Sequence, residues 1–128
     1  MSNIDELARI VVHESYLLHR EFGPGMLESA YECLLHARLR KQSLAVKPQH
    51  PVSVSAEGMD IPEAFRIDLL VENQLVIELK AVEQMHPVHL RQVLTYLILM
   101  KLPVGLLINF GAPTIREGIR RIANGHGE

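Results

Sequence analysis

The sequence predicts a mixed α/β fold, in which helices flank a sheet that combines parallel and antiparallel strands. Three observations predict it: apolar residues recur at helical spacing near both ends, apolar and polar residues alternate in the middle, and short aliphatic runs lie between turn residues. The expected order is two helices, three strands, a helix, a strand and a last helix. With 128 residues, 48% of them hydrophobic, the chain suits one domain over residues 1–128.

The N-terminal part of the chain predicts two helices. Helical spacing over residues 4–22 places apolar side chains on one face, at Ile4, Leu7, Ala8, Val11, Leu18 and Phe22. Asn3 and Glu6 are spaced for a capping box at the start of this helix. Gly23-Pro24-Gly25 ends it, because proline cannot continue the hydrogen-bond ladder. A second helix is expected over residues 26–41.

The middle of the chain predicts strands. Val52 and Val54 alternate with serines between prolines, which indicates an edge strand, and residues 57–60 indicate a turn. Residues 65–71 and 75–82 are rich in strand-forming residues. Only Glu72-Asn73-Gln74 separates them, so they predict a hairpin.

The last third predicts a helix, a strand and a further helix. Residues 88–100 have a helical composition and follow Pro87, and residues 104–110 form a short apolar strand that Gly111 closes. Isoleucines at helical spacing then predict a terminal helix, with Ile115, Ile119 and Ile122 on one face.

Charge and cysteine content narrow the functional classes. Thirteen basic and fifteen acidic side chains give a formal charge of −2, so binding of nucleic acid needs a locally basic face. Two basic clusters could follow a phosphate backbone or simply be solvated helix faces: Arg38, Arg40, Lys41 and Lys47, and Arg116, Arg120 and Arg121. A homodimer or a partner protein would supply further surface.

Cellular location and redox state follow from simple features of the chain. Cys33 is the single cysteine, which excludes an intrachain disulfide and a multi-cysteine zinc site. The N-terminus has no basic segment followed by an apolar one, and the longest apolar run is too short to cross a bilayer. We therefore expect a cytoplasmic protein with no membrane contact.

The predicted hairpin carries the most chemistry. Because strand side chains alternate between faces, Glu78 and Lys80 share one face of their strand. If the hairpin is centred on Asn73, Asp68 lies opposite Glu78, with Cβ atoms about 5 Å apart. A register shifted by one residue would place Leu79 opposite Asp68 and separate the polar groups.

Two carboxylates at that spacing repel each other unless a proton or a cation lies between them. Oxygen ligands with open water positions suit Mg²⁺ or Mn²⁺ better than zinc. Lys80 adds a positive charge beside Asp68 and Glu78, an arrangement that stabilises a phosphoryl transition state. The alternative is a surface hairpin with an ordinary Glu–Lys pair.

The pattern Asp68…Glu78-Leu79-Lys80 resembles the motif of the PD-(D/E)xK nuclease superfamily, with Ile67 where a proline often stands. Gly25-Met26-Leu27-Glu28-Ser29-Ala30-Tyr31 is similar to the signature of the bacterial GxxExxY proteins, a branch of that superfamily. Residues 76–82 and 104–111 also resemble this branch, and the similarity extends over residues 4–113.

The resemblance implies a restriction-endonuclease-like αβββαβ core with an extra N-terminal helix. It implies that Asp68, Glu78 and the backbone carbonyl of Leu79 bind Mg²⁺ or Mn²⁺, and that Lys80 assists catalysis. Glu28 corresponds to an acidic residue that completes the metal shell in related nucleases. Alternatively, Glu28 is an acid in the first turn of a helix, where the helix dipole favours it.

The same resemblance suggests residues that contact the substrate. Gln92 and Tyr96 lie four residues apart on one helix face and are similar to a Gln-x-x-x-Tyr element beside the active site of related enzymes. Tyr31 shares a helix face with Glu28. Both tyrosines have an alternative role as core residues, with the hydroxyl of Tyr96 at the rim.

The sequence therefore supports two functions. The first is a Mg²⁺- or Mn²⁺-dependent nuclease that hydrolyses phosphodiester bonds of DNA. The second is a non-cleaving nucleic-acid-binding or protein-assembly module that retains the nuclease fold.

Overall fold

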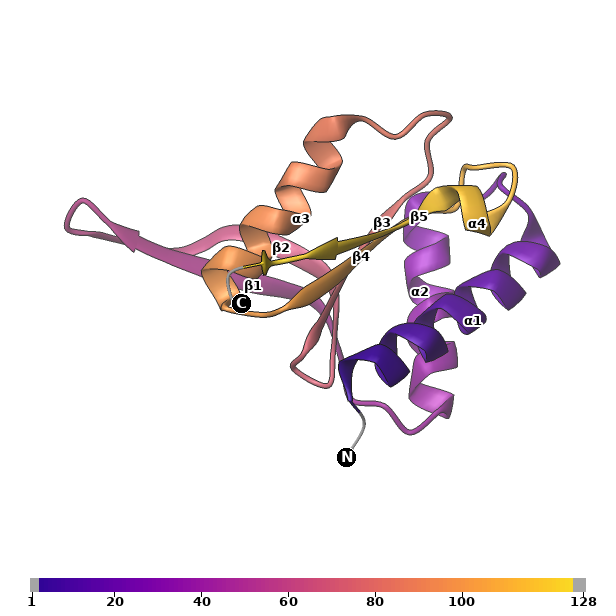
Figure 1. The fold of residues 1–128 in the computed structure, drawn as a ribbon, viewed down its shortest axis with the longest axis horizontal. Helices are drawn as coiled ribbons and strands as arrows, with labels where there is room; N and C mark the ends of the chain where they lie inside the picture. The colour runs from indigo at the N-terminus through magenta and orange to yellow at the C-terminus, as the bar shows by residue number, and fades with distance from the viewer. Residues whose placement is uncertain (1–2, 126–128) are drawn as a thin grey trace.

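A computed structural model of the chain describes residues 3–125, so residues 1–2 and 126–128 of the predicted domain lie outside the described part. Figure 1 shows a twisted sheet with α3 on one side and α1 and α2 on the other. The elements in chain order are α1 (Ile4–Phe22), α2 (Glu28–Lys41), β1 (Val46–Ala56), β2 (Met59–Val71), β3 (Leu75–Lys80), α3 (Pro87–Met100), β4 (Val104–Asn109), α4 (Ile115–Gly118) and β5 (Ile119–Ala123).

The sheet is mixed, as predicted. Its five strands lie in the order β1-β2-β3-β4-β5. Only β3 and β4 run parallel, and α3 connects them, because parallel neighbours need a crossover connection. The other neighbouring pairs are antiparallel. The segment from α2 to β4 reproduces the expected αβββαβ core, and α1 is the additional N-terminal helix.

Two apolar clusters fix the helices on the faces of the sheet. On one face, α1 and α2 pack on Leu69, Ile77, Leu79 and their neighbours. On the other, α3 packs through Val93 and Leu97 on strand residues that include Val76 and Leu107. Alternate residues of β3 therefore face different helices, which is why nearly all of this central strand is buried.

The helix ends agree closely with the predicted boundaries. The Asn3 side chain accepts a 2.8 Å hydrogen bond from the Glu6 backbone N–H at the start of α1. Gly23, with φ of 69°, ends that helix. At α3, His86 and His89 form a capping box. Among the described residues, no helix is long and apolar enough to cross a membrane.

The predicted terminal helix is wrong. Only Ile115–Gly118 is helical, and the chain then continues as β5, antiparallel to β4. Ile119 pairs with Ile108, and Ile122 pairs with Gly105. The basic residues Arg120 and Arg121 consequently lie on an edge strand, and only Arg116 of that cluster lies on a helix.

Beyond the body of the sheet, β1 and β2 extend together as a long hairpin that projects to the left in Figure 1. Its turn is formed by Glu57 and Gly58, both with positive φ. We call residues 53–64 the arm. All of its residues are exposed apart from half-buried Val54.

Candidate active site

The register of the β2–β3 hairpin decides whether its polar groups meet. The structure pairs Leu69 with Ile77, Leu70 with Val76, and Val71 with Leu75. Each pair is centred on Asn73, so the predicted register is confirmed. The next position along the two strands places Asp68 beside Glu78.

At this position each carboxylate accepts a hydrogen bond from the opposite strand. Leu79 donates its backbone N–H to Oδ2 of Asp68 at 2.8 Å. Asp68 donates its own backbone N–H to Oε1 of Glu78 at 3.4 Å. The backbone pairing of β2 with β3 ends at Leu69 and Ile77, and beyond that position these side chains connect the two strands. The two carboxylates are thereby held together at the end of the hairpin ladder.

Glu78 is almost completely buried, with 6% of its surface exposed, whereas Asp68 is half-buried. Burial and then the Asp68 charge raise the pKa of Glu78 to about 8; the Asp68 N–H and Lys80 act in the opposite direction, and Glu28 adds to the rise. The raised pKa favours the protonated form of Glu78 when no cation is bound. A carboxylate pair with one buried member is suited to accept a cation in place of that proton.

Glu28 and Lys80 approach this pair from different elements. Glu28 is the first residue of α2, and Lys80 is the last residue of β3. Partial desolvation and the Asp68 charge raise the pKa of Glu28, while the Lys80 ammonium lowers it. The structure thus brings Glu28, Asp68, Glu78 and Lys80 into one electrostatic environment, as the sequence predicts.

Gln49 and Glu32 are additional site residues that the sequence did not single out for this role. The Gln49 side chain donates to Oε1 of Glu32 at 2.8 Å and to Oδ1 of Asp68 at 3.3 Å. Gln49 has φ of 49°, between the paired residues Pro48 and His50 of β1. This unusual backbone conformation, which the sequence does not announce, directs the amide toward the carboxylates.

Gln92 and Tyr96 lie one turn apart on α3. Tyr96 is buried with its ring 5.0 Å from that of Phe65, which gives it the predicted core contacts. Burial, followed by the Glu78 and Asp68 charges, raises its pKa to about 12, so its hydroxyl lies near the acidic pair. Gln92 is exposed and free to contact a ligand.

Tyr31 is a core residue, the alternative to its predicted contact with the substrate. It is fully buried and stacks on Phe110, with ring centroids 4.4 Å apart. Its hydroxyl donates to the carbonyl of Gly23 and accepts from the Met26 N–H at 3.1 Å. Tyr31 therefore has no exposed surface in this structure through which it could make the predicted contact with the substrate.

The donor set is compatible with a hard divalent cation, because carboxylate oxygens dominate it. Within residues 3–125, no three His, Cys, Asp or Glu side chains form a ready-made cluster for a metal ion. Asp68 and Glu78 supply two carboxylates, and in the part of the chain that the structure describes the exposed Glu28 side chain makes no hydrogen bond that fixes its orientation. An ion at this site would complete its coordination with Glu28, a backbone carbonyl or water.

The mixed sheet with its flanking helices is the fold of restriction-endonuclease-like proteins, and comparison of the sequence with known protein families identifies the same class. Residues 5–122 match the PD-(D/E)XK nuclease superfamily, so the chain belongs to that superfamily. No curated protein and no solved structure matches the chain.

Proposed function

We propose that this protein is a Mg²⁺- or Mn²⁺-dependent nuclease that hydrolyses phosphodiester bonds of DNA. The superfamily supports a nuclease-type function. The observation that carries the proposal is the Asp68–Glu78 pair, in which the Glu78 carboxyl is buried and has a pKa raised to about 8 beside Lys80. We further assign the chain to the GxxExxY branch, on the match of Gly25, Glu28 and Tyr31 to its signature.

In this proposal Asp68, Glu78, Glu28 and the backbone carbonyl of Leu79 hold the ion. A bound Mg²⁺ or Mn²⁺ supplies Lewis-acid chemistry, which polarises the phosphate and acidifies water. Lys80 orients the attacking water and neutralises charge that develops on the phosphate. Gln49 keeps the Asp68 carboxylate in place through its hydrogen bond.

DNA contacts come from the surface around this pair. Gln92, exposed on α3, would contact the backbone next to the scissile phosphate, while the buried ring of Tyr96 supports that face of the helix. Arg40, Lys41 and Lys47 are exposed near the end of α2 and the start of β1 and form the nearest basic cluster along the chain. Arg38 contributes less, because Glu14 binds it at 2.9 Å.

One observation favours the alternative, a nucleic-acid-binding or assembly module that does not cleave. Both carboxylate oxygens of Asp68 already accept hydrogen bonds, from Leu79 and Gln49. A cation would have to share or displace these bonds. The two functions differ in one measurable property, because only the nuclease requires divalent-ion binding by Asp68 and Glu78.

The test uses the purified chain with supercoiled plasmid, linear duplex, single-stranded DNA and single-stranded RNA, each with Mg²⁺, Mn²⁺ or EDTA. We expect the wild type to cleave DNA when Mg²⁺ or Mn²⁺ is present. The variants Asp68→Asn and Glu78→Gln should abolish this cleavage. Glu57→Gln, an exposed carboxylate at the tip of the arm, is the matched control and should retain activity. Calorimetric titration with Mn²⁺ gives a second readout. Absence of both cleavage and Mn²⁺ binding would leave the non-cleaving module as the function.

A further inference from the structure

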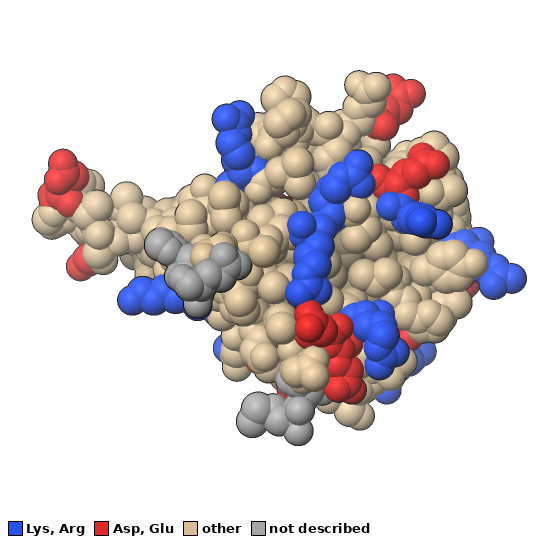
Figure 2. Space-filling view, in the orientation of Figure 1, with Lys and Arg blue, Asp and Glu red and all other residues tan. Residues whose placement is uncertain are grey.

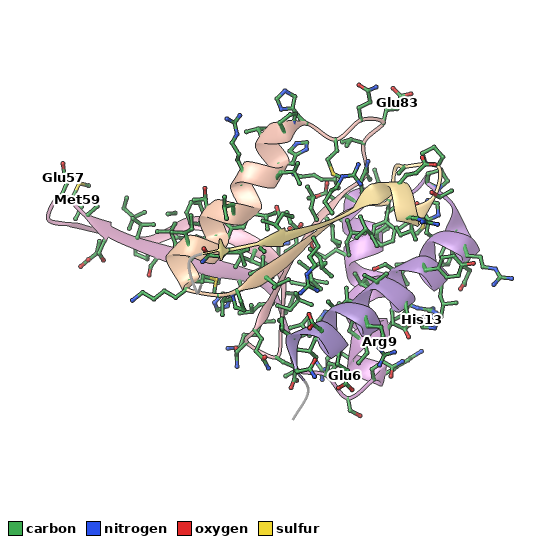
Figure 3. All side chains as sticks on the ribbon, viewed as in Figure 1. Glu6, Arg9, His13, Glu57, Met59 and Glu83 are labelled. Carbon is green, nitrogen blue, oxygen red and sulfur yellow. The ribbon has the colours of Figure 1, made fainter. Side chains whose placement is uncertain are left out.

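The arm is a projection that the rest of the described chain leaves uncovered. Figure 3 shows Glu57 and Met59 at its tip, far from the body of the molecule. Met59 and Ile61 have 61% and 42% of their surface exposed. An isolated two-stranded hairpin is marginally stable in water, so the arm gains stability from any surface that covers it.

The arm has an apolar face and an acidic charge. Val54 pairs with Ile61 and Ala56 pairs with Met59, and because side chains alternate along each strand, these four share one face. The acids of residues 53–64 are Glu57, Asp60 and Glu63, and this segment contains no Lys or Arg. Exposed Arg66, just beyond the arm, pairs with Glu63, so Glu57 and Asp60 carry the acidic charge of the tip. Figure 2 shows acidic side chains at the projecting end of the molecule.

A groove of complementary character lies between α1 and the segment formed by α4 and β5. Its volume is about 720 Å³, and its lining is mainly apolar, including Ala8, Val12, Leu106, Ile115 and Ile119. The same groove is bordered by cationic side chains, which include Arg9 and Arg116. Figure 3 shows Arg9 and His13 on the surface of α1.

The cations at this groove are available for a partner. Arg121 binds Asp5 at 2.7 Å, but within residues 3–125 neither Arg9 nor Arg116 forms an ion pair or a hydrogen bond through its side chain. Both are exposed. We call this surface, with its apolar floor and its two unpaired arginines, the α1–β5 groove.

We infer that the arm of one copy of this chain seats in the α1–β5 groove of a second copy. The apolar face of the arm would cover the apolar floor, and Glu57 would approach Arg9 and Arg116. Glu63 would exchange its ion pair with Arg66 for one with these cations. In Figure 1 the arm points away from α1, so the contact requires two molecules. This docking uses neither Asp68, Glu78 nor Lys80, and it therefore stands independently of the proposed cleavage.

Charge reversal gives a sharp test, because each surface can be inverted separately. The groove variant carries Arg9→Glu and Arg116→Glu, and the arm variant carries Glu57→Lys and Glu63→Lys. All four positions are exposed, so folding should persist, which circular dichroism would verify. Self-association is measured by sedimentation equilibrium over a range of protein and salt concentrations. Lys101→Glu, an exposed reversal outside both surfaces, is the control.

We expect the wild type and the control to dimerise, more weakly at high salt. Each double variant should weaken self-association by roughly tenfold or more, because like charges then face each other. An equimolar mixture of the two variants, and the quadruple variant, should recover the association, because opposite charges meet again. A wild type that stays monomeric, a dimer that tolerates both reversals, or a loss without recovery in the mixture would each overturn the inference.

Discussion

The amide of Gln49 lies within hydrogen-bond distance of the Asp68 carboxylate, with 3.3 Å between Nε2 and Oδ1. The same nitrogen donates to Glu32 at 2.8 Å. A neutral side chain thus connects two acids from different elements, one on α2 and one on β2. Since each acid raises the electrostatic cost of charging the other, the amide stabilises an arrangement that the carboxylates alone would oppose.

Gln49→Leu should remove this connection while keeping a similar side-chain volume. The Gln49 bond lowers the pKa of Glu32, so its loss should raise that pKa further above its ordinary value, which a carbon-detected NMR titration would follow. We also expect cleavage to fall about tenfold in kcat, because Asp68 loses orientation. Gln74→Leu, in the hairpin loop, is the matched control. An unchanged Glu32 titration would show that the amide does not act on these acids.

Lys80→Ala should abolish metal-dependent cleavage with little loss of stability. Lys80 ends β3 and is only half-buried, so its removal costs little packing, whereas the charge beside the acidic pair is lost. Plasmid cleavage and urea unfolding are the measurements, and Lys101→Ala at an exposed position is the control. Full activity of Lys80→Ala would remove this residue from the proposed chemistry.

The stability of the metal-free protein should fall as the pH rises from about 4.5 to about 8. The folded pKa of Glu78 is raised to about 8 from 4.5, so between these values the unfolded chain releases a proton that the folded chain retains. Because the folded state binds more protons, unfolding becomes easier with each step in pH across this window. Below the window this group contributes no pH dependence.

Glu78→Gln tests that linkage, because glutamine mimics the protonated carboxyl and cannot ionise. The variant should be more stable than the wild type at pH 8, by a few kcal/mol, and the difference should disappear near pH 4. Urea unfolding in EDTA at several pH values measures it. Added Mn²⁺ should raise the stability of the wild type at pH 8 but not that of the variant. Parallel pH profiles for the two proteins would contradict the raised pKa.

Gly111→Ala should destabilise the fold by about 1–3 kcal/mol, because there is no room for a larger residue. A Cβ atom at Gly111 would lie 2.4 Å from the carbonyl oxygen and 2.6 Å from the nitrogen of Val82. The Asn109 side chain, at the end of β4, holds the segment after β3 in place by bonds to the N–H and the carbonyl of Val82, at 3.0 and 2.9 Å. Relief by backbone movement would therefore disturb the loop that follows Lys80.

Gly25→Ala is the matched control, since a Cβ atom there meets no atom within 4 Å. Its effect on urea unfolding should stay within about 0.5 kcal/mol. Equal effects of the two substitutions would show that the close approach at Gly111 relaxes without cost.

Local patterns were sufficient for most of the fold. The spacing of apolar residues and the flanking cap and glycine gave α1 with the bounds that the structure has, Ile4–Phe22. The hairpin register followed from symmetry about Asn73, and with it the approach of Asp68 and Glu78. These features depend on interactions close in sequence, which single-chain patterns report well.

The errors and omissions have a different origin. Ile115, Ile119 and Ile122 have helical spacing, but β4 offers an unpaired edge that turns residues 119–123 into a strand. The sequence does not predict the role of Gln49, because that role depends on a positive φ within β1 and on the packing of α2 beside that strand. Neither contact leaves a local signal, since both arise from tertiary pairing.

The stacking of Tyr31 on Phe110 has a consequence for how this fold tolerates change. The first turn of α2 has no side-chain cap, and the Tyr31 hydroxyl holds the preceding loop instead. The Tyr31 ring, which packs on Phe110 at the end of β4, thereby sets where α2 begins. It also sets the distance of Glu28 from the sheet. Insertions between Gly23 and Glu28 would displace an acid from its neighbours without touching a single strand.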